Sequence, residues 1–332
     1  DACLKGKKRN DTYMNLQKGL VSFVIPCYCS EKTIEAVVAE IIEKVKEQSE
    51  YDYEIILVND FSKDDTKNVI KGLAEADHKI VAIDFSRNFG QHSAIMAGFW
   101  KVKGEYVVCL DDDGQMPIES VFDLIKELEK GADVVFGQYE EVKQKWYRNM
   151  GSRINVLMTE ILLDKPKELY MSSFWAGKRF VIEEVIRYEG AYPYIGGLLL
   201  RITKNMVSIP VKHRERLTGR SGYTFFKLIN LWMNGFTAFS VKPLRFATFC
   251  GMVCAAVGFI YGIVTIIRKL LDPDILMGYA STITVILFIG GMLMLMLGIV
   301  GEYIGRIYIC INKAPQYVIK EVIDKRTDGE ED

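Results

Sequence analysis

The sequence predicts an α/β domain with a mainly parallel, doubly wound sheet, followed by an interfacial helix and two transmembrane helices. The first observation behind this is the alternation of short apolar runs with helical periodicities over residues 21–137. The second is that several of these runs end in polar residues, most clearly in Asp111-Asp112-Asp113. The third is a pair of runs without formal charge, 246–267 and 275–301, each longer than the roughly 20 residues that cross a bilayer core as a helix.

Five apolar runs are predicted strands, and each of the first four is followed by a predicted helix. The strands cover 21–28, 54–60, 79–85, 107–110 and 133–137, and the helices cover 32–48, 64–74, 91–101 and a segment that begins near Pro117. We expect Ser62 to cap the second helix. Strands alternating with helices of this length predict a parallel sheet, and open α/β sheets bind ligands at the carboxyl ends of their strands.

Composition and missing motifs exclude several functions. The formal charge of -1 gives no general attraction to nucleic acid. The seven cysteines are scattered, odd in number and without C-x-x-C spacing, so neither a disulfide framework nor a zinc site is expected. No G-x-G-x-x-G follows the first strand and no G-x-x-x-x-G-K-[ST] is present, which argues against a dinucleotide-dependent dehydrogenase and a P-loop NTPase.

Charge around the two uncharged runs predicts their orientation. Lysine and arginine lie before the first run and after the second, and this bias favours a cytosolic soluble domain. Buried core helices are the alternative for both runs. The basic N-terminal residues are followed by no apolar segment, so we expect no signal peptide, and Met14 is the expected native start.

The acidic triplet has two open interpretations on its own. Asp and Gly are common in solvated turns, so Asp111 to Gly114 could be only a turn. Alternatively, Asp111 and Asp113 could bind a divalent cation that holds substrate phosphates, since such sites need only one or two protein carboxylates. A calcium loop is excluded, because the sixth and twelfth positions from Asp111 are Met116 and Phe122 instead of Gly and Glu.

Basic and aromatic residues precede the first uncharged run. Arg214, Arg216 and Arg220 fall within seven residues, and arginine binds phosphate bidentately. Residues 223–239 contain Lys227 as their only charge and are rich in Phe, Leu and Trp, which predicts a helix lying in the membrane interface. The alternatives are general attraction of the arginines to anionic lipid and a core helix packed on the sheet.

Together these features predict transfer of a sugar from a nucleotide donor to a lipid phosphate. A metal held by the acids would stabilise the leaving nucleoside diphosphate. Asp60 is placed to accept hydrogen bonds from a base or ribose, with helix capping as its alternative role. A lipid phosphate has a second pKa near 6, on the analogy of phosphoserine, and needs little help from a general base. We therefore assign no role to His78, His92 or His213.

Five motifs together resemble the polyisoprenyl-phosphate glycosyltransferases of glycosyltransferase family 2, which include dolichol-phosphate mannose synthases and bactoprenol glucosyltransferases. The motifs are Val24-Ile25-Pro26-Cys27-Tyr28 with Glu31; Val58-Asn59-Asp60; Arg87-Asn88-Phe89-Gly90; Asp111-Asp112-Asp113-Gly114-Gln115 with Pro117 and Glu119; and Arg216-Leu217-Thr218-Gly219-Arg220-Ser221-Gly222-Tyr223. Each motif alone is weak, but their order and spacing are specific.

The resemblance implies a GT-A fold and an inverting transfer from a nucleotide sugar, expected to be UDP-linked, to undecaprenyl phosphate or a similar polyprenyl phosphate. By position it implies three sets of site residues. The nucleotide-sugar site would be Pro26, Tyr28, Glu31, Asp60, Arg87, Asp111 and Asp112; the Mg²⁺ or Mn²⁺ ligands would be Asp111, Asp113 and Gln115; and the acceptor phosphate would meet Arg214, Arg216, Arg220 and Ser221. Asp111, Asp113, Arg216 and Ser221 are the expected catalytic residues.

The expected organisation is an integral protein of a bacterial cell membrane. It comprises a disordered or non-native N-terminal segment (1–19), a cytosolic GT-A catalytic domain (20–222), an interfacial amphipathic helix and connector (223–245), a transmembrane hairpin (246–310) and a cytosolic C-terminal tail (311–332). Gly290, Gly291 and Gly298 offer small-residue surfaces on which a homo-oligomer could pack.

Three positions depart from the family pattern: Gly114 replaces a Leu, Met116 replaces a Pro, and Gly222 replaces a phosphate-binding Lys, whose charge Arg220 could supply. Members often have an acid in the segment matching 167–174, where Glu168 is the candidate. Two rival functions remain at this point. A polysaccharide synthase would need a Gln-x-x-Arg-Trp motif and more membrane spans, and a sugar-nucleotide-binding protein without activity would explain the three replacements as decay.

Overall fold

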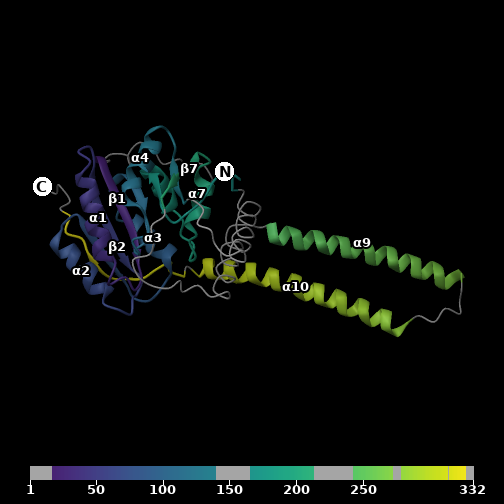
Figure 1. Cartoon of the computed structure of the whole chain (residues 1–332). Coiled ribbons are helices and arrows are strands. Elements are labelled where there is room, and N and C mark those ends of the chain that lie inside the picture. Colours follow the sequence, from purple (N-terminus) through teal and green to yellow (C-terminus); the bar gives the residue numbers. More distant parts are fainter. Residues whose placement is uncertain (1–16, 140–164, 213–241, 272–277, 313, 327–332) are drawn as a thin grey trace, which may run out of the picture. The chain divides into compact units, whose positions relative to one another are not determined.

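The computed structural model describes residues 17–139, 165–212, 242–271, 278–312 and 314–326 (Figure 1). The chain divides into two units, which are described separately. The first comprises Asp1–Tyr223 with Pro315–Asp332, and the second comprises Thr224–Ala314.

The first unit contains one eight-stranded sheet with the order β7-β5-β6-β4-β1-β2-β3-β8. In chain order the strands are β1 (Gln17–Cys27), β2 (Asp52–Asn59), β3 (Ile80–Phe85), β4 (Gly104–Cys109), β5 (Val134–Tyr139), β6 (Trp175–Lys178), β7 (Met206–Val211) and β8 (Ile319–Ile323). The central strands β4, β1, β2 and β3 pair in parallel, as do β5 and β7. The antiparallel strands are β6, between β4 and β5, and β8, at the edge beside β3. The predicted mainly parallel α/β fold is confirmed.

Helices cover both faces of this sheet. They are α1 (Ile34–Lys46), α2 (Thr66–Ala76), α3 (Gln91–Phe99), the 3-10 turn η1 (Ile118–Ser120), α4 (Val121–Glu129), α6 (Arg179–Val185) and α7 (Ile195–Ile202). Side chains alternate across each strand. Val21, Phe23 and Ile25 of β1 therefore join the buried core beneath α1 and α4. Val24 points to the opposite face, where a Cβ on Gly98 of α3 would come within 2.5 Å of its Cγ1.

The predicted cap of the second helix is wrong. Helix α2 begins after Asp65, and the Ser62 hydroxyl instead donates to Asn59 Oδ1 and accepts the Cys29 N–H at 2.9 Å. Ser62 therefore links the ends of β1 and β2. The segment 311–332, expected to be a tail, contains a sheet strand, β8, which pairs antiparallel with β3.

The second unit contains two long helices, α9 (Lys242–Leu271) and α10 (Tyr279–Ile311). Among the described helices, one stretch, Phe288–Ile309 of α10, is long and apolar enough to cross a membrane, with a mean hydropathy of 1.7. A shorter apolar stretch, Ala247–Tyr261, lies in α9. The second predicted span thus overlaps a helix of spanning length, while the arrangement of two spans stays a prediction. The predicted interfacial helix, 223–239, lies outside the described residues.

Candidate active site

Three predicted site segments meet at one edge of the sheet. Because β4, β1 and β2 are parallel neighbours, the residues after them lie side by side: Asp111 to Asp113 after β4, Tyr28 after β1 and Asp60 after β2. The Tyr28 N–H donates to Asp112 Oδ2 at 2.9 Å, which joins two of these segments directly. The expectation that the acids lie at a shared carboxyl edge is therefore confirmed.

Both carboxylate oxygens of Asp111 accept hydrogen bonds from side chains. Gln91 Nε2, at the start of α3, donates to its Oδ1 at 2.8 Å, and the Ser173 hydroxyl donates to its Oδ2 at 2.7 Å. Burial raises the pKa of Asp111 to about 6; the hydrogen bond from Ser173 opposes this rise, and the nearby Asp113 and Asp112 add to it. The protein thus holds a desolvated carboxylate between neutral donors and beside other acids, an arrangement that a cation would stabilise.

The other two acids of the triplet have backbone partners. Burial raises the pKa of Asp112, and the hydrogen bond from the Tyr28 N–H works against that rise. Asp113 Oδ1 accepts the Gln115 N–H at 3.1 Å. Gly114 between them has φ +71°, a left-handed conformation that glycine adopts without strain. The triplet is therefore followed by a turn. Two of the replacements in the family pattern now have a structural reason. Gly114 permits the turn, and Met116 is buried, with its sulfur accepting the Asp111 N–H.

Asp60 is buried beneath the loop that joins β3 to α3. Its two carboxylate oxygens accept the N–H groups of Phe89 and Gly90, at 2.7 and 2.8 Å, and its carbonyl accepts a hydrogen bond from Asn88 Nδ2 at 3.0 Å. Burial raises the pKa of Asp60, and the two N–H groups oppose this. In this structure Asp60 fixes the conformation of residues 86–90, and the alternative of a helix cap does not apply because α2 begins after Asp65.

The remaining predicted donor residues lie around this edge. Pro26 is buried in β1 opposite Val58. Glu31 accepts the Asp65 N–H at 2.9 Å and donates its own N–H to Asp64, so it secures the start of α2. The Arg87 guanidinium lies 4.6 Å from the centre of the Phe89 ring, in a cation–π contact.

Some residues at this edge have no counterpart in the sequence motifs. Ser173 and Gln91 both contact Asp111, although they are 62 and 20 residues away from it. Phe61, which follows β2 in a left-handed conformation with φ +57°, is 47% exposed, and Tyr28, which follows β1, is 49% exposed. Gln91 could have been noticed directly after the Arg87–Gly90 motif, but nothing local marks Ser173. Glu168, the candidate acid of that segment, is exposed.

The predicted acceptor residues, Arg214, Arg216, Arg220 and Ser221, lie outside the described residues. The predicted metal ligands, Asp111, Asp113 and Gln115, lie together on the turn after β4. No group of three or more His, Cys, Asp or Glu side chains suited to a metal occurs among the residues that the structure describes. Two carboxylates and an amide are nevertheless hard oxygen donors of the kind that Mg²⁺ and Mn²⁺ accept, with substrate phosphates completing the shell. The donor set therefore fits such an ion.

Comparison with known proteins identifies the family. The model of "Glycosyl transferase family 2" matches residues 22–186, and that of "GtrB C-terminal hairpin" matches residues 242–307. A protein of Escherichia coli (strain K12), named "Prophage bactoprenol glucosyl transferase homolog", is 32% identical over 312 residues, which cover 91% of this chain and 99% of that protein. An "Undecaprenyl-phosphate 4-deoxy-4-formamido-L-arabinose transferase" of Proteus mirabilis (strain HI4320) is 34% identical and covers 91% of this chain and 94% of its own length.

A solved structure supports the fold. The crystal structure of a mycobacterial protein is similar with a TM-score of 0.51 at 16% identity, covering 67% of this chain and 75% of that one. Three findings agree on the family: the motifs at the strand ends, the GT-A-like sheet, and the relatives that match along nearly their whole length. The chain therefore belongs to glycosyltransferase family 2, in the group whose α/β domain is followed by a GtrB C-terminal hairpin.

Proposed function

We propose that this protein transfers a sugar from a nucleotide-sugar donor, a UDP-sugar, to undecaprenyl phosphate or a similar polyprenyl phosphate in a bacterial cell membrane. The observation that carries the proposal is the cluster of carboxylates, with Asp60 buried and Asp111 to Asp113 partly buried, at the shared ends of β1, β2 and β4 in a family 2 domain. Relatives named bactoprenol and undecaprenyl-phosphate transferases, similar over nine tenths of the chain, support the lipid acceptor.

The donor would lie across the strand ends. The exposed rings of Tyr28 and Phe61 present flat faces on which a nucleobase can stack. The donor pyrophosphate would lie near the triplet, where Asp111, Asp113 and Gln115 would hold Mg²⁺ or Mn²⁺. Such an ion, when bound, supplies positive charge that stabilises the departing nucleoside diphosphate. Gln91 and Ser173 fix the orientation of Asp111, so the carboxylate is positioned before the donor arrives.

The acceptor needs no general base. A polyprenyl monophosphate with a second pKa near 6 is mostly a dianion at neutral pH. One of its oxygens attacks the anomeric carbon, the bond from that carbon to the donor phosphate oxygen breaks, and the nucleoside diphosphate leaves with the electron pair. Attack from the opposite face inverts the anomeric configuration. Arg214, Arg216, Arg220 and Ser221 are the residues assigned to the acceptor phosphate.

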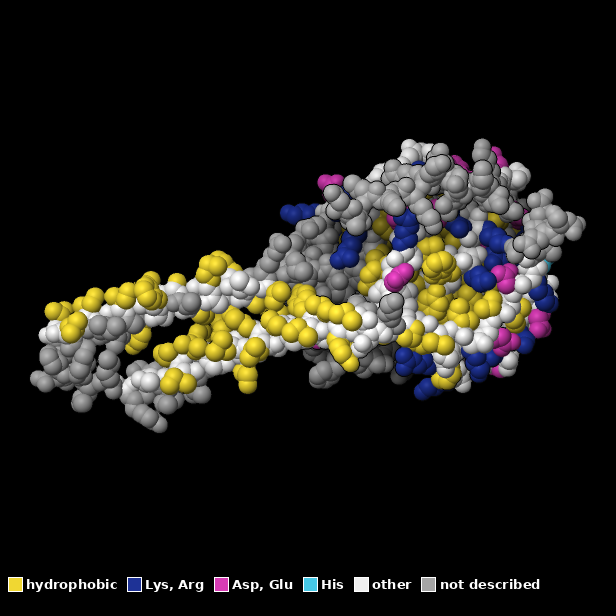
Figure 2. All heavy atoms as spheres, turned by 180° about the vertical axis from the view of Figure 1, so that it is seen from behind, with side chains coloured by type: hydrophobic (Ala, Val, Ile, Leu, Met, Phe, Trp, Pro, Cys, Tyr) yellow, Lys and Arg dark blue, Asp and Glu magenta, His cyan; other side chains and the backbone are white. Residues whose placement is uncertain are grey.

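The apolar helices fit a lipid acceptor. Leu293, Met294 and Leu297 of α10 are 55%, 74% and 63% exposed, and Figure 2 shows hydrophobic side chains along both long helices. Exposed apolar surface of this extent marks a protein or membrane contact. We assign the second unit to the membrane as a two-helix hairpin, with the catalytic domain in the cytosol. The length and hydropathy of Phe288–Ile309 support one of the two spans.

A donor screen tests the function. Purified full-length protein in lipid vesicles would receive labelled nucleotide sugars, Mg²⁺ or Mn²⁺, and polyprenyl phosphate. We expect one donor to give a lipid-linked sugar, with no product when EDTA replaces the metal. Replacement of Arg216 by Ala is expected to raise the KM for the lipid acceptor. Absence of lipid product from all common nucleotide sugars, with intact nucleotide binding, would instead indicate a binding protein without transferase activity.

A further inference from the structure

The chain beyond the second long helix returns to the sheet and extends along its edge. Strand β8 pairs antiparallel with β3, from Ile323 opposite Ala82 to Ile319 opposite Phe85. One end of this C-terminal segment, residues 316–326, therefore lies at the amino end of β3, and the other end reaches the carboxyl end, where the candidate donor site lies.

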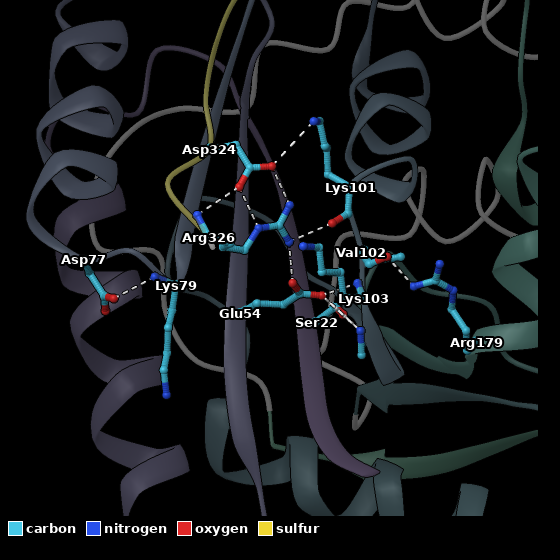
Figure 3. Close-up of polar contacts among 11 residues, drawn as sticks. Ser22, Glu54, Asp77, Lys79, Lys101, Val102, Lys103, Arg179, Asp324 and Arg326 are labelled. Atoms are coloured by element: carbon cyan, nitrogen blue, oxygen red, sulfur yellow. Dashed lines mark hydrogen bonds and ion pairs between the residues drawn. The ribbon is translucent and has the colours of Figure 1, made fainter. Parts of the chain in front are cut away.

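The amino end of the sheet anchors the segment through a buried ion pair. Arg326 contacts Glu54 and Asp324, and its guanidinium also donates to the Lys101 carbonyl at 2.8 Å (Figure 3). The side chains of Arg326 and Glu54 are 9% and 3% exposed. Glu54 also accepts hydrogen bonds from Ser22 and from the Gly104 N–H, so Arg326 completes a network among β1, β2 and β4. Removal of one partner of a buried ion pair strongly destabilises the folded protein, because the other charge is left buried and unpaired.

Lysines of α2 attach the middle of the segment. Lys67 bridges Asp84 of β3 and Glu321 of β8, at 2.8 and 3.1 Å. Lys71 contacts the other oxygen of Glu321 at 3.2 Å. The Lys71 pair is 41% and 38% exposed, so it contributes little to stability, and Lys71 provides a control position.

The carboxyl end of the sheet holds the segment through an aromatic ring and the backbone. The Tyr317 ring stacks on the ring of Phe85, with centroids 5.4 Å apart and planes 5° from parallel. The Ser86 N–H donates to the Val318 carbonyl at 3.0 Å. Gln316 Nε2 donates to the carbonyls of Tyr188 and Gly190 at 2.8 and 2.7 Å, which fixes the residue before the stacked ring.

These contacts continue into the candidate donor site. The Phe85 ring packs edge-on against Phe89, with centroids 5.7 Å apart and planes at 86°. The N–H of Phe89 is one of the two groups that hold the Asp60 carboxylate. An uninterrupted set of contacts therefore runs from Tyr317 through Phe85 and Phe89 to Asp60. The C-terminal segment contacts loop 86–90 directly through the Val318 carbonyl, and it supports Phe89 indirectly through the stacked rings of Tyr317 and Phe85.

We propose that the C-terminal segment is a positioning element of the donor site, and that Tyr317 holds the loop 86–90 in the conformation that binds the nucleotide sugar. This inference rests on the proposed function. Tyr317 is a positioning residue and not a catalytic one, because it acts on the donor through Phe85 and Phe89. This segment follows α10 in the chain, so the residues after the long helix contribute to the donor site.

The test compares three full-length variants: Tyr317→Ala, Tyr317→Phe and Lys71→Ala. Small displacements of a binding loop have large kinetic effects, and we expect Tyr317→Ala to raise the KM for the nucleotide sugar about tenfold while the KM for polyprenyl phosphate stays unchanged. Tyr317→Phe keeps the stacked ring and should restore the wild-type KM. Lys71→Ala removes an exposed contact of the same segment and should also keep the wild-type KM.

Hydrogen exchange of the peptide containing residues 86–90 gives a readout that does not depend on turnover. We expect faster exchange in Tyr317→Ala than in wild type or Tyr317→Phe, because the N–H groups that bind Asp60 lose their support. Unchanged donor KM and unchanged exchange in Tyr317→Ala would overturn the positioning role. An equal rise in both KM values would also overturn it. Failure of the proposed function looks different, since the wild type itself would then give no lipid-linked product.

Discussion

Asp111 combines a catalytic assignment with a cost in stability. Its pKa in the folded protein is about 6, above the ordinary value of 3.8, and burial is the main cause. A carboxyl group whose pKa rises on folding is harder to ionise in the native state, so its ionised form destabilises the fold. The penalty is absent below the ordinary pKa of 3.8, grows as the pH rises from there towards 6, and is complete above about pH 6. In the metal-free protein, therefore, the ionised Asp111 side chain lowers the free energy of unfolding.

Replacement of Asp111 by Asn should remove this penalty. At pH 8, in EDTA, we expect the free energy of unfolding to increase by on the order of 2 kcal/mol, with a much smaller gain at pH 4.5, while transferase activity is lost. Chemical denaturation at both pH values measures this. Asp123→Asn, on the exposed side of α4, is the control and should change stability by less than about 0.5 kcal/mol. A less stable Asp111→Asn protein at pH 8, or an equal gain at both pH values, would contradict the assigned cause.

Ser173 shows what sequence motifs cannot supply. Its hydroxyl donates to Asp111 from 62 residues away, and removal of this donor should raise the pKa of Asp111 further and loosen its orientation. We expect Ser173→Ala to weaken activation by Mg²⁺ or Mn²⁺ about tenfold. Titration of activity with the metal measures this. Ser172→Ala is a matched control, because the Ser172 hydroxyl donates to the Phe174 carbonyl, and its metal dependence should match that of the wild type. Identical metal dependence in both variants would remove Ser173 from the site.

Among the secondary-structure elements, α3 links the core to the site. It begins directly after Gly90, whose N–H binds Asp60, and it packs on β1 through Gly98. A Cβ at Gly98 would come within 2.5 Å of Val24 Cγ1, so Gly98→Ala should push α3 away from the sheet and cost about 1–3 kcal/mol of unfolding free energy. Gly72→Ala in α2 is the control, because a Cβ there meets nothing within 4 Å, and it should be neutral or slightly stabilising. Equal stability of the two variants would show that the close packing at Gly98 is not needed.

The sequence predicted those elements whose signals are local. The alternation of apolar runs and helices identified β1 to β5 and the helices between them, and the polar residues at strand ends identified the edge where Tyr28, Asp60 and Asp111 meet. It did not predict β6 or β8. Both are short antiparallel strands whose place in the sheet depends on distant pairing, with β4 66 to 72 positions away for β6 and with β3 234 to 241 positions away for β8. Four or five residues also carry too little periodicity to identify a strand.

The residues of the candidate site were also predictable only in part. Motif residues were predictable because the chemistry they perform restricts residue type and spacing. The hydrogen bonds that orient them were not, since Ser173, the N–H groups of Phe89 and Gly90, and Tyr317 act through tertiary contacts that any suitable donor or ring could make.

For the whole molecule, the apolar helix Phe288–Ile309 should be a membrane anchor. Leu297 lies near its middle and is 63% exposed, so Leu297→Arg should place a charge near the bilayer centre at a cost of about 2.5–3.5 kcal/mol. We expect less protein in the carbonate-resistant membrane fraction. Leu270→Arg, beside Arg268 and Lys269 at the end of α9, is the control and should remain in the membrane fraction. Equal membrane recovery of both variants would argue against Phe288–Ile309 as a span.

In the proposed reaction the carboxylate site joins a sugar to a lipid phosphate and releases a nucleoside diphosphate. The most direct measurement is the identity and amount of the nucleotide released as lipid-linked sugar forms. Wild-type protein should release one nucleoside diphosphate for each lipid-linked sugar, with none formed without polyprenyl phosphate and none by Asp111→Asn. Release of a nucleoside monophosphate, or nucleotide release that does not require the lipid phosphate, would contradict the proposed sugar transfer to polyprenyl phosphate.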